Sequence, residues 1–342
     1  MQLWDIVTPV DLTAFARMVP DDLPNNLNRF LPDRTIVGIK SRVARRSRTN
    51  TTARYRAWNA ETPIGQRPDT VAVTEVKLPP LGQKLILTEW DQLQLDAANG
   101  SQSAVAAMIA TIYDDTESNV AAIRNRLELA RGDLLTDGKF TLTAENGLTL
   151  EADYGMAGSH KPTAGTLWDA ADPTPLSDEI TWSRLMQTDG GGRPVVALGN
   201  PEITALLLAS DEYRAAYWGG NAGSQPRLNL EQLNTVRRAN GLAPYEEYDH
   251  QVSVDGVTTR VIPLTKFILL GANVGETQFG ATAEALELAQ SNAVDFTTQD
   301  SPGIFAAAYK LPDPVTGISK ANATAMPVLA DVNAIVSATV QS

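Results

Sequence analysis

The spacing of apolar residues predicts one long helix from Ser101 to Leu135. Apolar side chains recur there at steps of three and four residues, which places them on one face of a helix. They are Val105, Met108, Ile109, Ile112, Val120, Ile123, Leu127, Ala130 and Leu134. Ser101 can cap the start, Gly138 lies just past the end, and residues 114–116 could bend the helix, which would be about 50 Å long. It is either a core helix of an ordinary globular protein or a strut with different elements at its two ends.

Residues 1–34 are predicted to form an arm without a fold of its own. Four prolines interrupt the segment, and only Leu12–Met18 could form a short helix. The arm nevertheless carries the large apolar residues Trp4, Leu12, Phe15, Phe30 and Leu31. A free tail would not carry so many, so we expect the arm to lie extended across another surface.

Residues 35–90 are predicted to form a long β-rich extension. Its first part, Thr35–Ala60, is strongly basic and is called the basic limb. The β-rich stretches are Thr35–Lys40, Thr51–Trp58, Thr70–Leu78 and Lys84–Thr88. No acidic residue occurs between Thr35 and Ala60, and the arginines gather in this stretch. They are Arg42, Arg45, Arg46, Arg48, Arg54 and Arg56.

The basic limb has three interpretations. It is a solvated edge strand whose charges discourage unwanted pairing, or a nucleic-acid patch, although only Tyr55 and Trp58 supply aromatic rings. The third is an arm that grips an acidic neighbouring copy of the same protein, because the rest of the chain is acidic.

The remainder of the chain divides into three predicted stretches. Two β-rich runs flank Asn146-Gly147, a strong hairpin signal. Residues 190–272 alternate strand and helix patterns and are predicted to form a compact α/β unit, with Asn200 capping the helix that opens at Pro201. Residues 273–342 are mainly β.

Composition narrows the classes of protein. The chain has 342 residues, of which 43% are hydrophobic, so a sizeable core can form. It has no cysteine, which excludes disulfides and thiolate chemistry. The N-terminus does not resemble a signal peptide, and no apolar run is long enough to span a membrane. A net charge of −12 argues against tight non-specific binding to nucleic acid.

No catalytic, cofactor or metal site is predicted. His160 and His250 have no second ligand at metal spacing, and both are expected at the surface. The glycines at 190–192 precede Arg193-Pro194 rather than Gly-Lys-Ser/Thr, so they do not form a phosphate loop. Adjacent carboxylates such as Asp114 and Asp115 do not face one shared site. We therefore expect neither an enzyme nor a cofactor.

The order of these parts resembles the major capsid proteins of tailed phages, and more narrowly the lambda-type capsid protein E family. KLPPLGQKLILTEWDQLQL (77–95) resembles the family's exit from its extended loop, and RLELARGDLLTDGKFTL (126–142) the end of its spine helix. PVVALGNPEITALLLAS (194–210), LNTVRRANGLAPYEEYDHQVSVDG (233–256) and IPLTKFILLG (262–271) are similar to its axial domain, and VGETQFGATAEALEL (274–288) to the return from it. The ordered set carries the resemblance, which covers nearly the whole chain and is weakest in the first thirty residues.

The resemblance implies an α+β fold of the Hong Kong 97 type. Residues 1–34 would be an N-terminal arm, 35–90 an extended loop, 91–189 a peripheral domain with the spine helix, 190–272 an axial domain and 273–342 a return to the peripheral domain. The six arginines of the limb would face carboxylates of an adjacent subunit, with the spine helix as one candidate.

The implied function is that of a major capsid protein. Pentamers and hexamers would form an icosahedral shell around double-stranded DNA, without sequence-specific binding and without a membrane. A scaffolding protein and a portal would take part in assembly, and a decoration protein is a further possible partner. The protein would lie in the virion, and in the host cytoplasm during assembly. The alternative is the shell of an encapsulin-like nanocompartment.

Overall fold

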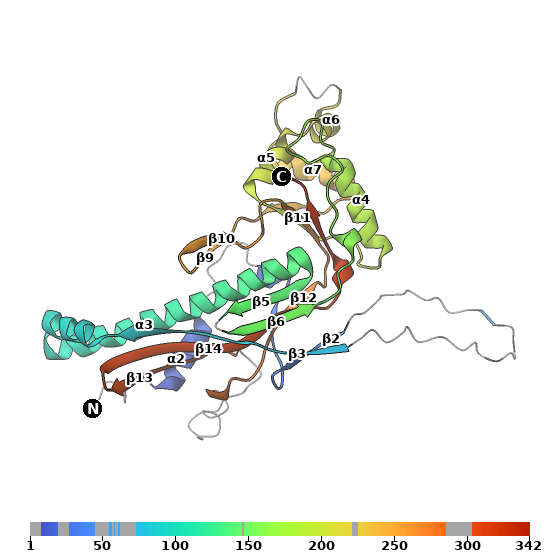
Figure 1. Cartoon of the computed structure of the whole chain (residues 1–342). Helices are drawn as coiled ribbons and strands as arrows, with labels where there is room; N and C mark the ends of the chain where they lie inside the picture. Colours follow the sequence, from blue (N-terminus) through green and yellow to red (C-terminus); the bar gives the residue numbers. More distant parts are fainter. Residues whose placement is uncertain are drawn as a thin grey trace.

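The structure is a computed structural model, and it describes most of the chain. The described residues are 8–19, 27–44, 55–56, 58, 61, 73–145, 147–220, 225–284 and 303–342. Figure 1 shows a compact α/β unit at the top, a long helix crossing the middle and long strands beneath that helix.

The long helix is α3 (Glu89–Asp137), of 49 residues and about 74 Å. Thr88 and Asp91 form a capping box at its start, and Gly138 ends it in the left-handed conformation at φ 68°. The helix therefore begins twelve residues before the predicted start, and Ser101 lies inside it rather than capping it. Residues 114–116 do not break the helix, which runs through them without interruption, and the Thr116 hydroxyl donates to the Ile112 carbonyl within it.

The largest sheet has five strands. They are β1 (Asp33–Thr35), β4 (Pro80–Leu87), β12 (Gly275–Phe279), β13 (Phe305–Pro312) and β14 (Val315–Leu329). The strand order is β1-β12-β14-β13, and β4 pairs with β14. Small side chains of β13 and β14 let α3 and the short helix α2 (Pro9–Met18) approach the sheet closely, and a buried cluster joins all of them. The predicted short helix at Leu12–Met18 thus lies within α2.

Two hairpins extend from this body. β5 (Lys139–Glu145) and β6 (Leu148–Asp153) flank the predicted turn at residues 146–147. β2 (Lys40–Ala44) pairs with β3 (Val73–Lys77) and lies to the right of the body in Figure 1. Gly38 at φ 100° separates β1 from β2, so the predicted strand Thr35–Lys40 is not continuous.

The α/β unit is built on a four-stranded sheet of order β15-β11-β7-β8. Its strands are β7 (Val196–Gly199), β8 (Tyr245–Glu247), β11 (Lys266–Leu270) and β15 (Ile335–Thr339). Its helices are α4 (Pro175–Thr188), α5 (Pro201–Ala209), α6 (Asp211–Trp218) and α7 (Leu230–Ala239). A further hairpin joins β9 (Gln251–Val254) to β10 (Val257–Arg260). As predicted, Asn200 caps α5, accepting from the Glu202 and Ile203 amides.

Both faces of this sheet are buried, which explains its near-continuous apolar strands. In β11, Phe267 and Leu269 belong to the cluster with the helices of the unit, and Ile268 and Leu270 to the cluster beside α3. The sheet therefore connects the unit to the long helix.

Two elements lie outside the predicted divisions. α4, inside the predicted peripheral stretch 91–189, contributes Trp182 and Met186 to the cluster of the α/β unit. β15, inside the predicted return 273–342, pairs with β11 of that unit. The described strands of residues 35–90 also belong to different sheets, since β4 pairs with β14 whereas β2 pairs with β3. The division into five parts stays a prediction.

Candidate functional site: a buried junction and the surfaces around it

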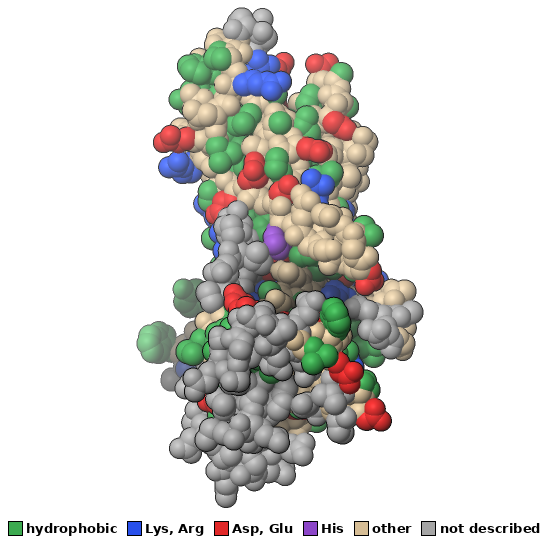
Figure 2. Space-filling model, turned by 90° about the vertical axis from the view of Figure 1, so that its left-hand side faces the viewer, with side chains coloured by type: hydrophobic (Ala, Val, Ile, Leu, Met, Phe, Trp, Pro, Cys, Tyr) green, Lys and Arg blue, Asp and Glu red, His purple; other side chains and the backbone are tan. Residues whose placement is uncertain are grey.

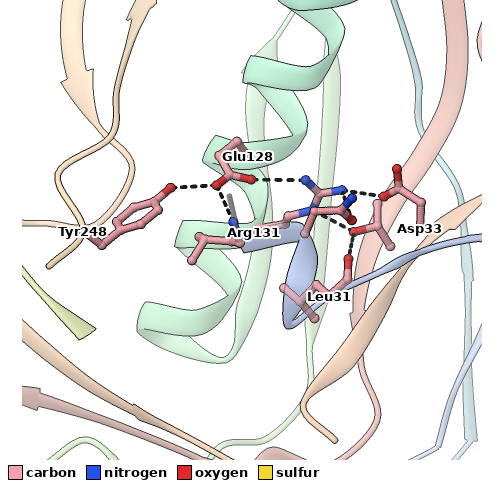
Figure 3. A network of polar contacts seen from close by, with 8 residues as sticks. Leu31, Asp33, Glu128, Arg131 and Tyr248 are labelled. Carbon is pink, nitrogen blue, oxygen red and sulfur yellow. Dashed lines mark hydrogen bonds and ion pairs between the residues drawn. The ribbon is translucent and has the colours of Figure 1, made fainter. Parts of the chain in front are cut away.

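The junction is a network of polar contacts around Arg131 of α3, drawn in Figure 3. The Arg131 side chain is 4% exposed and donates in four directions. Nε donates to Thr277 Oγ1 (2.9 Å), Nη1 to Glu128 Oε2 (3.1 Å), and Nη2 to Asn28 Oδ1 (3.2 Å) and Asp33 Oδ1 (2.5 Å). One planar guanidinium therefore holds α3, β12 and the segment before β1 together.

Glu128, one helical turn before Arg131, connects two more segments to this network. Its Oε1 accepts from the Leu27 amide and from the Tyr248 hydroxyl, each at 2.7 Å. Tyr248 lies between β8 and β9 of the α/β unit. Burial raises the pKa of its hydroxyl far above the usual range, and the adjacent carboxylate of Glu128 raises it further. The hydroxyl is thus held as a donor.

Thr277 closes the network on the opposite side of Arg131. It is fully buried, and its hydroxyl donates to the Leu31 carbonyl at 2.9 Å. Residues 27–33 are predicted from the sequence to belong to an arm without a fold of its own. In the structure, hydrogen bonds hold this stretch against α3 and β12. The arm's Leu27 and Leu31 are fully buried beside them, as expected for a segment that lies across another surface.

A second buried network lies inside the α/β unit. Arg237 of α7 forms an ion pair with Glu179 of α4, and both side chains are 0% exposed. Tyr213 of α6 donates to Glu179 Oε1 (2.8 Å) and accepts from Arg237 Nη1 (3.2 Å), and Arg237 Nε donates to the Ala243 carbonyl (2.8 Å). This network joins three helices of one unit. It therefore has an internal structural role.

Most of the predicted contact arginines lie outside the described residues. Arg45, Arg46, Arg48 and Arg54 are among them. The backbone of Arg42 pairs with Glu75 in the β2–β3 hairpin. Arg56 is exposed, between the exposed rings of Tyr55 and Trp58. Four of the six arginines thus lie outside the described residues, and the role of the set stays a prediction.

The surface prediction for His160 is wrong. The residue is 1% exposed, because Nδ1 contacts the Ile335 carbonyl of β15 (2.7 Å) and Nε2 contacts Asp189 Oδ2 at the end of α4 (3.0 Å). His250 is half-buried. Among the described residues, no group of three or more His, Cys, Asp or Glu side chains is placed so that it could hold a metal ion.

The Arg131 network was missed by reasoning from the sequence. Its only local signal is that Glu128 and Arg131 sit beside the apolar stripe residues Leu127 and Ala130, where a charged group is expensive unless paired. The partners at Asn28, Asp33 and Thr277 lie about a hundred or more residues away and carry no such signal.

No described helix has both the length and the apolar character needed to cross a bilayer. Figure 2 shows acidic, basic and hydrophobic side chains interspersed over the upper part of one face of the molecule.

The comparisons with known proteins agree with this architecture. The family profile described as "Phage major capsid protein E" matches residues 12–340. A prophage protein of E. coli CFT073 that is assigned as a capsid protein superposes with a TM-score of 0.64 at 16% identity, covering 98% of this chain and 99% of that one. A phage-related protein from Bordetella bronchiseptica RB50 gives 0.60 at 10% identity, covering 97% of each chain.

A search of curated proteins found no match. The two solved structures share little sequence with this chain, so they show the fold, which is the Hong Kong 97 type of phage capsid proteins. The family profile covers nearly the whole chain. The chain therefore belongs to the phage major capsid protein E family, a family of structural proteins that form the capsid shell of the virion.

Proposed function

We propose that this chain assembles as pentamers and hexamers into an icosahedral head that encloses double-stranded DNA. The observation that carries the proposal is the family match over residues 12–340. The described architecture supports it, because a long helix backed by a sheet supplies a rigid plate, and the α/β unit and the β2–β3 hairpin project from it in different directions.

The proposal assigns a role to each part. Residues 190–272 form the axial domain, which meets its neighbours around each local axis, and 91–189 with 273–342 form the peripheral domain. Residues 35–90 are the extended loop over the next subunit, and 1–34 are a further strap. Hydrogen bonds hold residues 27–33 at the Arg131 junction. They support a strap whose C-terminal end is fixed to its own subunit.

The basic limb is proposed to contact the spine helix of the next copy. Asp114 and Glu117 are exposed on α3 and Asp115 is half-buried beside them, and within the described part of the chain no cation pairs with any of them. Burial raises the pKa of Asp115, and repulsion from Asp114 raises it further, as expected where negative charge is uncompensated. Six arginines on a neighbour would supply the missing charge as a network.

The remaining assignments follow from the same role. A scaffolding protein and a portal take part in assembly in the host cytoplasm, a decoration protein can bind the finished shell, and the chain catalyses no reaction. The acidic net charge of −12 supports loose enclosure of DNA, whose charge is neutralised mainly by its own counterions.

The proposal is tested by electron microscopy and light scattering of the chain, expressed alone and with its neighbouring genes. We expect closed shells or tubes with five- and six-fold rings. Small uniform shells that retain a cargo protein would favour the encapsulin-like alternative. A stable monomer or dimer in both preparations would overturn the proposal.

The limb contact is tested by charge reversal. Arg54→Glu with Arg56→Glu is expected to lower the yield of shells, and adding Asp114→Arg with Glu117→Arg is expected to restore part of it. Normal shells from the arginine variant alone would overturn the limb's role. Loss of shells that the two α3 substitutions do not rescue would indicate that the limb contacts carboxylates other than Asp114 and Glu117.

A further inference from the structure

The strand β4 has one paired side and one open side. Its residues 80–87 pair with 317–324 of β14. Within the described part of the chain no strand pairs with its other side, whereas β14 is paired along both sides at residues 317–322. An unpaired strand edge presents backbone donors and acceptors that favour the addition of another strand.

The register shows which backbone groups are open. The Ala325 amide donates to the Pro79 carbonyl (3.3 Å), so the odd-numbered residues of β4 point their backbone groups toward β14. The N–H and C=O groups of Gly82, Lys84 and Ile86 therefore point away from it. Gly82 and Lys84 are exposed, and Ile86 is 52% exposed, so these groups are accessible.

An open hollow of about 650 Å³ lies against this strand. Its lining includes residues of both paired strands, Pro80–Lys84 of β4 and Lys320 and Asn322–Thr324 of β14, together with Ala281–Glu284. The hollow therefore lies over one face of the β4–β14 pair and leaves the open edge of β4 beside it uncovered by β14.

The charges beside the hollow favour an acidic occupant. Glu284 is already satisfied, since it accepts from Asn322 Nδ2 (2.7 Å) and pairs with Lys320 (3.4 Å). Lys84 has no anionic partner among the described residues. A lysine on an open edge discourages unwanted pairing, whereas an acidic residue opposite it on an added strand would stabilise the pair.

We propose that the open edge of β4 is a docking edge for an extended, acidic segment of a second copy of this chain, which adds a strand to the large sheet. The occupant is a second copy because the family forms shells of its own subunits and the chain carries a net charge of −12. The inference rests on the proposed assembly into a shell.

Hydrogen exchange with single-residue resolution tests this directly. In the unassembled chain, the amides of Gly82, Lys84 and Ile86 are expected to exchange quickly. Those of Leu81, Gln83 and Leu85 are the internal control, because β14 protects them in both states. In shells of this chain alone, the three outward amides should slow by about two orders of magnitude.

Unchanged exchange at these amides in well-formed shells would overturn the docking edge and leave the shell function standing. Absence of shells both from the chain alone and from its expression with the neighbouring genes would instead count against the proposed function. Protection that arises only when a neighbouring gene product is added to shells that have already formed would assign the edge to a different protein, and would also overturn the proposal.

A pair of variants at one position gives a second test. Lys84→Pro removes the outward N–H while keeping all bonds to β14, and edge positions of this kind tolerate proline. Lys84→Ala keeps the N–H and removes only the charge. We expect the proline variant to lower the yield of shells at least tenfold more than the alanine variant does, with unchanged far-UV circular dichroism. Equal yields would contradict the added strand, and if the proline variant misfolds, the exchange measurement decides.

Discussion

Arg131 and Arg237, the two buried arginines in the described part of the chain, differ in what they connect. Arg237 is surrounded by groups of one α/β unit, and its partners Glu179 and Tyr213 belong to the helices of that unit. Arg131 binds groups from residues 28, 33, 128 and 277, and Glu128 extends the network to Tyr248. The first arginine stabilises a unit, whereas the second joins segments that are far apart in the chain.

The two networks also differ in how far their carboxylates are exposed to solvent. Glu179 and Arg237 are both 0% exposed. Of the two carboxylates that pair with Arg131, Glu128 is 1% exposed but Asp33 is 25% exposed. Water can therefore compensate the charge of Asp33 when the second network opens, but no charge of the first network. The Arg237 network should open only when its unit unfolds, and the Arg131 network can open first.

The largest expected effect is that of Arg237→Met. It leaves the buried carboxylate of Glu179 without its cation, so the free energy of unfolding of the unit should fall by about 3–5 kcal/mol. Urea denaturation of the unassembled chain, followed by the fluorescence of the buried Trp168 and Trp182, measures it. Adding Glu179→Gln removes the stranded charge and should recover part of the loss. No recovery would show that packing rather than charge is responsible.

Arg131→Met should have the next largest effect, about 2–3 kcal/mol, because Asp33 can be rehydrated. Its distinguishing result is local: limited proteolysis should cut within residues 27–35 while the α/β unit stays folded. Arg131→Lys keeps the charge but not the planar fork, so it should lie between wild type and the Met variant. Cleavage of the α/β unit before residues 27–35 would contradict the proposed difference.

The helix and turn signals in the sequence were sufficient for much of this fold. Gly138, the β5–β6 hairpin and the Asn200 cap lie where local chemistry predicts. The early start of α3 was missed because its first turns do not follow the apolar stripe: Trp90 is 67% exposed and Leu93 is 63% exposed. The Thr88–Asp91 capping box decides the start instead.

The junction was harder to predict for a physical reason. Arg131 contacts Asp33 across 98 residues and Thr277 across 146 residues. Such contacts depend on how the sheet returns to the helix, which no local pattern encodes. His160 shows the same limit, because its burial depends on β15, which joins the α/β sheet from the end of the chain.

Two tyrosines allow a finer comparison of the networks. Tyr248→Phe removes one bond to Glu128, which keeps the bond from the Leu27 amide, so we expect a loss of about 1–2 kcal/mol. Tyr213→Phe removes a donor to Glu179 and an acceptor for Arg237, so its loss should be larger, about 2–3 kcal/mol. Denaturation curves of the two variants under the same conditions measure the order, and equal losses would remove the distinction.

The smallest effect is expected at Asp115, a carboxylate of α3 that has no cation among the described residues. Its raised pKa, caused first by burial and then by Asp114, means that the folded chain binds the proton more tightly than the unfolded chain. The ionised form therefore lowers stability at neutral pH. Asp115→Asn should raise the free energy of unfolding of the unassembled chain by less than about 0.5 kcal/mol. The measurement is a slightly higher melting temperature.

The pH dependence of this gain identifies its origin. The gain should be full at neutral pH and disappear as the pH falls below 3.8, the ordinary pKa of an aspartate, because both proteins are then neutral at this position. Asp114→Asn is the matched control, since it removes only the repulsion and should give a smaller gain. If the basic limb of a neighbour contacts this surface, Asp115→Asn should stabilise the free subunit and yet weaken the shell. A gain in both states would place the limb's contact elsewhere.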